Sequence, residues 1–215
     1  MGLYDIVGML VPGAVMVGAA LMSFSQIGLF NPSHFADSEF IIATFFILAS
    51  YIMGHVIHGL GGLFLSARKL GYASKRFLQE KDTHYSATFK KKLRELAAQT
   101  FGVEADGDAQ KIFDLCYTYT QVRGIDAHIQ LMNGRHGFFR NIVISAAITA
   151  VLMMVPPLGH WVCKSIDANT IALNILLALL SLAIIPVAFN RWRRFGERFA
   201  DHVYRTFYVD RLLSR

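Results

Sequence analysis

Charged residues are missing from four long stretches of this chain. Residues 6–30, 40–65, 141–163 and 168–190 contain no Asp, Glu, Lys or Arg. Each stretch exceeds the roughly 20 apolar residues that a helix needs to cross a bilayer. Apolar residues make up 54% of the chain and charged residues only 17%, so little polar sequence remains to cover four such helices in water. The composition disfavours a soluble globular protein and predicts an all-α polytopic membrane protein with four transmembrane helices.

Cysteine is also scarce. Cys116 lies between the second and third apolar runs, and Cys163 lies at the far end of the third, so the two should face opposite sides of the membrane. The chain has neither a CxxC motif nor the Cys and His spacing of a zinc site. We therefore expect no disulfide between these two residues.

The polar residues that are present divide the chain into four segments. A first transmembrane hairpin covers residues 1–65, and a basic helical insert covers residues 66–140. A second hairpin covers residues 141–190. Residues 191–215 form a basic tail in which Trp192, Phe195 and Phe199 recur at helical spacing. We interpret this tail as an amphipathic helix that continues from the fourth span or lies beside it at the membrane surface.

The basic residues predict the orientation. Of the 21 Lys and Arg residues, thirteen lie in residues 66–140, seven lie in residues 191–215, and one is Lys164. Because basic loops stay in the cytoplasm, the insert and the C-terminus should both be cytoplasmic. Four spans then place the N-terminus there too. We expect the plasma membrane of a bacterium, that is, the inner membrane, as the location.

The insert carries the residues that we assign to ligand binding. A helix is expected from Ser86, with Gly102 at its C-terminus, and Asp108 is the expected N-cap of a second helix. Arginine and lysine suit phosphate, and aromatic rings suit the stacking of bases. On the alternative interpretation, these charges only fix topology and attract anionic lipid, and the lysines form a solvated face. The candidate ligand-binding residues are Lys90, Lys91, Lys92, Arg94, Tyr117, Tyr119, Arg123 and Arg135.

The second span contains a histidine pair with glycines on both sides. His55 and His58 are three residues apart and should share a helix face, and Gly54 and Gly59 adjoin them. The histidines could be hydrogen-bonded packing residues, line a wet pore, or hold a metal or haem. The glycines suggest a hinge or a tight helix crossing. We treat these four residues as the candidate pore or hinge.

Prolines and small residues mark the other spans. Pro12 predicts either a break between a short interfacial helix and the first span or a kink in a single helix. Pro156 and Pro157 should break or end the third span. Ala14 and Gly18 form a small-xxx-small pair that could let two helices approach closely, although Gly and Ala are simply common in membrane helices.

Polar groups within the spans predict an assembly of several copies. His55, His58 and Asn174 need partners in the membrane. We expect a homo-oligomer of about four or more copies, because closed cyclic assemblies are common.

Part of the chain resembles a known class of protein. The sequence from Gly134 to Asn141 opens a span, two closely spaced spans follow, and the basic aromatic helix runs from Arg191 to Tyr208. This layout, over roughly residues 130–210, resembles small prokaryotic membrane effectors of nucleotide-signalled anti-phage defence, namely the SMODS-associated and Hailong-type membrane effectors. The resemblance implies membrane disruption or ion conduction after binding of a nucleotide or short oligonucleotide made by a companion nucleotidyltransferase.

Three functions follow from these features. The first is a ligand-gated oligomeric membrane effector or ion channel, and the second is a non-conducting scaffold whose insert docks a cytoplasmic partner. An enzyme or haem carrier built on His55 and His58 ranks last, because the spans contain no Asp or Glu after Asp5 and the HxxH pattern lacks the Glu of HExxH. We therefore expect neither enzymatic activity nor a cofactor.

Overall fold

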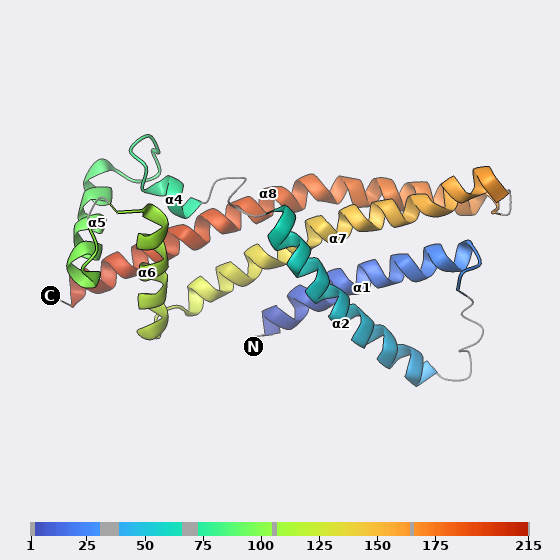
Figure 1. Cartoon of the computed structure of the whole chain (residues 1–215), viewed down its shortest axis with the longest axis horizontal. Coiled ribbons are helices and arrows are strands. Elements are labelled where there is room, and N and C mark those ends of the chain that lie inside the picture. Colours follow the sequence, from blue (N-terminus) through green and yellow to red (C-terminus); the bar gives the residue numbers. More distant parts are fainter. Residues whose placement is uncertain (1–2, 31–38, 66–72, 105–106, 164–165, 215) are drawn as a thin grey trace. The chain divides into compact units, whose positions relative to one another are not determined.

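The computed structural model describes residues 3–30, 39–65, 73–104, 107–163 and 166–214, and all regular secondary structure among these residues is helical. Four helices are long and apolar enough to cross a membrane, and the all-α membrane fold is confirmed. The helices labelled in Figure 1 are α1 (Leu3–Gln26), α2 (Glu39–Phe64), α4 (Ala73–Phe77), α5 (Ala87–Phe101), α6 (Ala109–Val122), α7 (Ala127–Cys163) and α8 (Ala168–Leu213).

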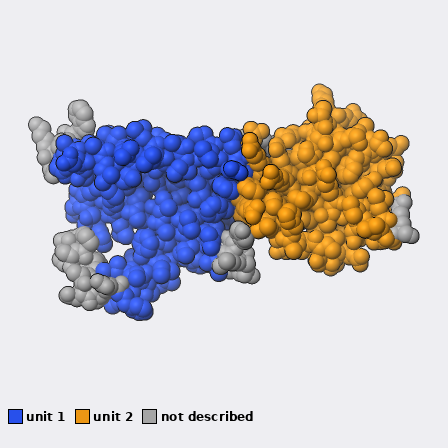
Figure 2. Space-filling view, turned by 180° about the vertical axis from the view of Figure 1, so that it is seen from behind, with its two compact units in different colours: residues 1–65, 137–192 blue, residues 66–136, 193–215 orange. Residues whose placement is uncertain are grey.

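These helices belong to two compact units, which are coloured separately in Figure 2. Unit 1 comprises residues 1–65 and 137–192, and unit 2 comprises residues 66–136 and 193–215. Unit 1 thus combines the two hairpins, and unit 2 combines the insert with the tail. Helices α7 and α8 each contribute one stretch to unit 1 and another to unit 2.

Helix α1 passes through Pro12 without a break, so the kinked-helix alternative describes it better than two separate helices. A proline has no N–H, and Pro12 therefore leaves the carbonyl of Gly8 without its usual helical donor. The side-chain amide of Asn141 on α7 donates to that carbonyl at 3.0 Å. One turn further along α7, the Ser145 hydroxyl donates to the Pro12 carbonyl at 2.8 Å.

A carbonyl that a proline frees in α7 likewise accepts a hydrogen bond from a side chain of α1. Contrary to the sequence prediction, Pro156 and Pro157 lie inside a helix that continues to Cys163. Pro156 removes the donor for the Leu152 carbonyl. The buried hydroxyl of Ser23 on α1 donates to that carbonyl at 2.7 Å. Helices α1 and α7 therefore satisfy each other's proline-freed carbonyls, and their ascending contacts show that the two run in the same direction.

Helices α1 and α2 cross with their backbones in contact (Figure 1). A Cβ atom added to Gly13 would lie 1.8 Å from the Ser50 carbonyl oxygen, and one added to Gly54 would lie 2.1 Å from that of Met9. Only glycine fits at either position. The expected small-residue contact in α1 thus uses Gly13, whereas Gly18 has nothing within 4 Å of a built Cβ.

The outer faces of unit 1 are apolar. In the most apolar stretch of α7, 44% of the residues are buried. The corresponding share is only 17% in α2 and 17% in α8. Large exposed side chains on α2 and α8 include Phe40, Phe45, Leu48, Ile52, Leu176, Leu179 and Val187. Exposed surface of this kind at membrane depth contacts lipid. The protein is therefore embedded in a bilayer, with α7 as the most enclosed of the four spans.

Unit 2 has a hydrophobic core of its own. Ser86 caps the N-terminus of α5 through the Phe89 amide, and Gly102 ends the helix in the left-handed conformation at φ 64°. Asp108 caps α6 through the amide of Gln110. These three predictions are confirmed. The buried core residues come from α4 and the segment after it and from α5, α6, α7 and α8, and include Phe77, Leu78, Leu93, Ile112, Cys116, Ile129, Val203, Tyr204 and Phe207.

The tail is continuous with the fourth span, because α8 runs unbroken from Ala168 to Leu213. Its apolar stripe does not lie on lipid as expected. Phe195 is only 9% exposed, and Phe199 packs edge-on against Phe113 and Tyr117 of α6. The tail residues of α8 form part of the core of unit 2, so the prediction of an interfacial helix is wrong.

Candidate functional site

A polar cluster lies in unit 1, where α2 meets α7. Nη2 of Arg140 lies 3.1 Å from each ring nitrogen of His58 and 3.4 Å from its carbonyl oxygen. The amide nitrogen of Asn141 lies 3.4 Å from Nδ1 of the same ring. Both neighbours can only donate from these atoms, so the imidazole of His58 acts as an acceptor. Gly61 makes room for this cluster, because a Cβ there would lie 3.0 Å from Nε of Arg140.

The other predicted pore residues do not share this environment. His55 is exposed, and its ring packs edge-on against Tyr51 at a centroid distance of 4.7 Å. Gly59 is exposed and has open space around it, whereas Gly54 is the buried crossing point described above. The four candidates therefore have separate roles. His58 and Gly54 join α2 to its neighbours, and His55 and Gly59 face outward.

The partners of the intramembrane polar groups lie mostly within one chain. His58 contacts Arg140 and Asn141, and the buried amide of Asn174 on α8 donates to Gln26 at 2.6 Å. His58 and Asn174 thus have the partners that we expected them to need, but these partners lie within the chain, and the homo-oligomer stays a prediction. Only His55 is left to support the argument for an assembly.

Two of the predicted ligand-binding residues hold unit 2 together instead. Lys90 is 7% exposed, and its ammonium donates to the carbonyl oxygens of Gln79 and Asp82. The expectation that it lies on a solvated face is wrong, because its position on α5 follows the buried face of that helix. Arg94 donates to the Leu78 carbonyl at 3.2 Å, so its guanidinium also ties α5 to the preceding segment.

Tyr119 and Arg123 are brought together by an acid that the sequence analysis did not single out. The Tyr119 hydroxyl donates to Oδ2 of Asp210 at 2.6 Å, and Nε of Arg123 lies 3.6 Å from the same oxygen. Asp210 comes from the end of α8, so this group fastens the tail to α6. An arginine already paired with a carboxylate is a weaker phosphate ligand than a free one, because the ligand has to displace that carboxylate.

Tyr117 and Arg135 lie elsewhere in unit 2. The Tyr117 ring packs against Phe113 and Phe199, and burial, together with the nearby Asp126 carboxylate, raises the pKa of its hydroxyl. The guanidinium of Arg135, in the first turns of α7, lies over the Phe195 ring at 5.7 Å. The eight predicted ligand residues therefore form no single site in the described part of unit 2.

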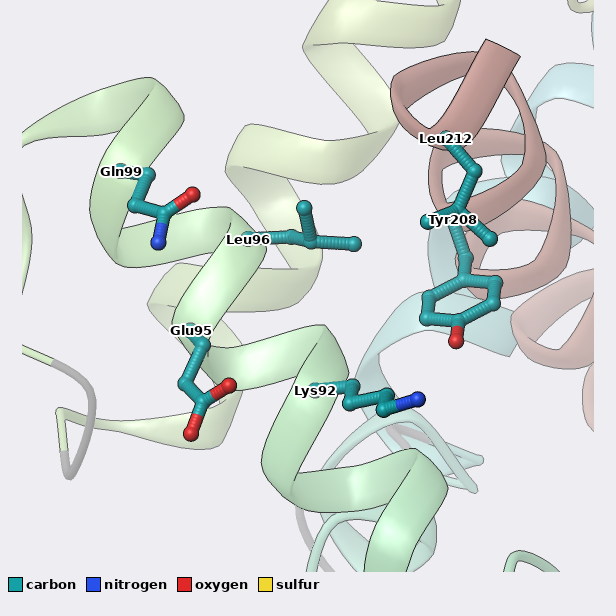
Figure 3. Close-up of a pocket in the computed structure, with 6 residues that line it drawn as sticks. All are labelled: Lys92, Glu95, Leu96, Gln99, Tyr208 and Leu212. Atoms are coloured by element: carbon teal, nitrogen blue, oxygen red, sulfur yellow. The ribbon is translucent and has the colours of Figure 1, made fainter. Parts of the chain in front are cut away.

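The two remaining candidates, Lys91 and Lys92, are exposed on α5. Lys92 reaches into a pocket of about 200 Å³, and Figure 3 shows the α5 side chains on one side of it and the α8 side chains on the other. Glu95 places a carboxylate in the same pocket, which disfavours a phosphate there. The lining residues are Lys92, Glu95, Leu96, Gln99, Tyr208 and Leu212.

Several residues that shape these sites were missed by the sequence analysis. Arg140 and Asn141 entered the sequence analysis only as part of the stretch from Gly134 to Asn141 that opens the third span, although Pro12 and Pro156 carried a usable signal. Each proline in a membrane helix frees the carbonyl four residues earlier, and a polar residue elsewhere in the spans is then needed to satisfy it. Ser23 and Asn141 are two such residues.

The structure offers no metal centre in its described part. No group of three or more His, Cys, Asp or Glu side chains among the described residues could hold an ion. Comparison of the chain with protein-family models, with curated proteins and with solved structures finds no match.

Proposed function

We propose that this protein is a signal-responsive membrane effector, in which unit 2 senses a cytoplasmic signal and the four spans alter the permeability of the bilayer. One observation carries the proposal. Helices α7 and α8 each belong both to the core of unit 2 and to the spans of unit 1. A ligand that binds one packing arrangement of unit 2 more tightly shifts the population toward that arrangement, and two of the four spans are part of it.

Helix α2 is the span that we propose to move. It is among the least buried spans, and it is held at the Gly13–Gly54 crossing and by the contacts of His58 with Arg140 and Asn141. The partners of His58 lie on α7, which also enters unit 2. Breaking a few hydrogen bonds at this end costs little, so a modest signal can release α2.

The remaining features of the proposal follow from the sequence. Both termini and unit 2 lie in the cytoplasm of a bacterium, and the spans lie in its inner membrane. About four or more copies assemble, with His55 facing a neighbouring copy or a wet pathway. The signal is a nucleotide or short oligonucleotide supplied by a companion nucleotidyltransferase, and the protein itself performs no chemistry.

Membrane potential in living cells tests the proposal. Strong expression raises the number of assemblies in the minor open state, so a potential-sensitive dye should report depolarisation. His55→Leu should reduce the depolarisation, because it removes the outward-facing polar group of α2. His58→Leu should increase it, because it removes the acceptor that holds α2 to α7. Cells that keep a normal potential, with the protein fully present in their membranes, would contradict the proposal.

A second function is favoured by the pocket between α5 and α8. Lys92 and Glu95 place opposite charges in it, and Leu96 and Leu212 give it an apolar lining, a mixture that suits a protein segment better than a polyphosphate. On this alternative, the protein is a non-conducting membrane scaffold or assembly subunit that docks a cytoplasmic partner. Normal membrane potential, together with loss of a co-purifying partner in Leu212→Glu, would favour the scaffold.

A further inference from the structure

A row of basic side chains follows the contact between α7 and α8 within unit 2. The rings of His128 and His202 pack edge-on at 4.5 Å. Arg135 lies two helical turns after His128 on α7, and Arg198 lies one turn before His202 on α8. The guanidinium carbons of Arg135 and Arg198 lie 5.7 and 5.8 Å from the centre of the Phe195 ring. Arg135 and His128 come from α7, and Arg198 and His202 come from α8. We call these four residues the basic seam.

The acids near the basic seam are engaged elsewhere. Glu197 pairs with Arg76 at 2.9 Å. Asp201 accepts hydrogen bonds from Tyr85 and Arg205, and Asp126 accepts one from Gln130. Among the described residues, neither Arg135 nor Arg198 forms an ion pair with a carboxylate. Arg135 and Arg198 therefore lack a carboxylate partner such as the one that Arg123 has in Asp210.

The arginines of the seam are also held in place. Phe195 is buried, and its ring supports both guanidinium groups through cation–π contacts. Across the same contact, the ring of His136 lies against Gly196, where a Cβ would come within 2.9 Å of it. The two helices are thus packed closely beneath the seam. Side chains that are already ordered lose less entropy when they bind a ligand.

We propose that the basic seam binds a phosphate-bearing ligand, with Arg135 and Arg198 as the ligands of the phosphate group. His128 and His202, further along the same contact, offer hydrogen-bond donors to another part of that ligand. Planar guanidinium groups bind phosphate oxygens in pairs, and the two guanidinium carbons here lie 5.7 and 5.8 Å from the centre of one ring. The phosphate belongs either to a soluble phosphate ester or to the headgroup of an anionic lipid. In the soluble case, the inference rests on the proposed function and places the sensor of unit 2 on α7 and α8.

Two binding arms distinguish the sources. In the first, the full chain in a neutral detergent is titrated with inorganic pyrophosphate and with cyclic dinucleotides, and binding is followed by calorimetry. In the second, the same protein is titrated with short-chain phosphatidylglycerol, with short-chain phosphatidylcholine as the neutral control. The protein variant is Arg135→Gln with Arg198→Gln. The matched control is Lys81→Gln with Lys111→Gln, which removes the same charge from exposed positions outside α7 and α8.

The site predicts a loss of about tenfold in affinity for each arginine removed, in whichever arm shows binding, with the lysine control within about twofold of wild type. Arg135→Lys with Arg198→Lys keeps the charge but loses the planar fork, so an intermediate affinity is expected even if the glutamine variant folds poorly. Binding in the pyrophosphate arm identifies a soluble ligand, and binding only to phosphatidylglycerol identifies a lipid. Equal losses in the arginine and lysine variants, or no binding in either arm, would overturn the site.

The same measurement separates the site from the proposed function. If binding depends on Arg135 and Arg198 but the protein does not permeabilise membranes, the phosphate site is supported and the effector function is contradicted. If the protein depolarises cells but binds the ligand equally well without the two arginines, the effector function is supported and the phosphate site is contradicted.

Discussion

The side-chain amide of Asn141 donates to the carbonyl of Gly8, which Pro12 deprives of a donor within its own helix. The hydroxyl of Ser23 donates in the same way to the carbonyl of Leu152, which Pro156 leaves without a donor in its own helix. Each helix thus donates a side-chain hydrogen bond to the carbonyl that a proline frees in the other helix. These bonds matter because an unsatisfied carbonyl is costly in hydrocarbon. This exchange satisfies the carbonyls that Pro12 and Pro156 free in α1 and α7, and it holds the two helices in a fixed register.

The exchange predicts a specific energetic coupling. Asn141→Leu should destabilise the protein by about 1 kcal/mol, because hydrogen bonds between membrane helices are worth about that much. In a P12A background, the amide of residue 12 regains its N–H and can donate to the Gly8 carbonyl. Asn141→Leu should then cost less than half as much. Unfolding free energies measured in mixed micelles give the coupling through a double-mutant cycle.

The control for this cycle combines each donor variant with the proline variant of the other carbonyl. Ser23→Ala should couple to P156A in the same way, whereas Asn141→Leu with P156A and Ser23→Ala with P12A should be additive. Additivity in all four combinations would show that the proline-freed carbonyls are not what Asn141 and Ser23 stabilise.

A second prediction concerns the crossing of α1 and α2. Gly54→Ala places a methyl group 2.1 Å from the backbone oxygen of Met9, which cannot move aside on its own, so the helices must separate. We expect a loss of about 1–3 kcal/mol, as for overpacking elsewhere. Gly59→Ala is the matched control, because nothing lies within 4 Å of its Cβ position, and it should be neutral or slightly stabilising. Equal thermal stability of the two variants would argue against the tight crossing.

A third prediction separates adjacent lysines of α5. Lys90→Met keeps the apolar stem but removes the ammonium that holds the carbonyls of Gln79 and Asp82. The loss should be about 1.5–3 kcal/mol, the range for hydrogen bonds to charged groups. Lys91→Met, at an exposed position, should change the stability by less than about 0.5 kcal/mol. Hydrogen exchange in residues 79–85 should accelerate only in the Lys90 variant, and similar exchange in both would refute the assignment.

A fourth prediction is a pH dependence. Burial, and then the hydrogen bond to Asp201, raise the pKa of Tyr85 above its ordinary value of 10.0. The folded state therefore favours the neutral phenol, and the stability that this group supplies is complete below pH 10.0 and declines as the pH rises further. Tyr85→Phe should cost about 1 kcal/mol at pH 8, and this difference from wild type should shrink above pH 10. A difference that stays constant up to pH 11 in chemical unfolding would contradict the assignment.

Much of the fold was predictable because its signals are local. Four uncharged runs marked the spans, and Ser86, Gly102 and Asp108 marked the ends of α5 and α6 through the geometry of their own turns. The continuity of α1 and α7 was not predictable from local rules. A proline's effect on a helix depends on whether a donor reaches the freed carbonyl, and those donors lie 129 and 133 residues away along the chain.

The candidate site was less predictable than the fold. Lys90 was taken as solvated, although it lies three residues before Leu93 and seven before Ala97, on the buried face of α5. The apolar stripe of the tail was identified correctly, but helical spacing does not reveal whether a stripe packs on lipid or on protein. Likewise, a free arginine and a paired one look the same in sequence. Only the fold shows that Arg123 lies beside Asp210, whereas Arg135 lies beside an uncharged ring.

The most direct test of the effector is dye release from liposomes that contain the purified protein. Each of a panel of cyclic dinucleotides and short DNA and RNA oligomers is added outside, where inside-out copies of the protein present unit 2. We predict that at least one of these probes releases the dye in proportion to the protein present, and that His58→Leu lowers the probe concentration required. Release no greater than that of protein-free liposomes with every probe, from protein shown to be folded and inserted, would contradict the proposal that the protein permeabilises membranes.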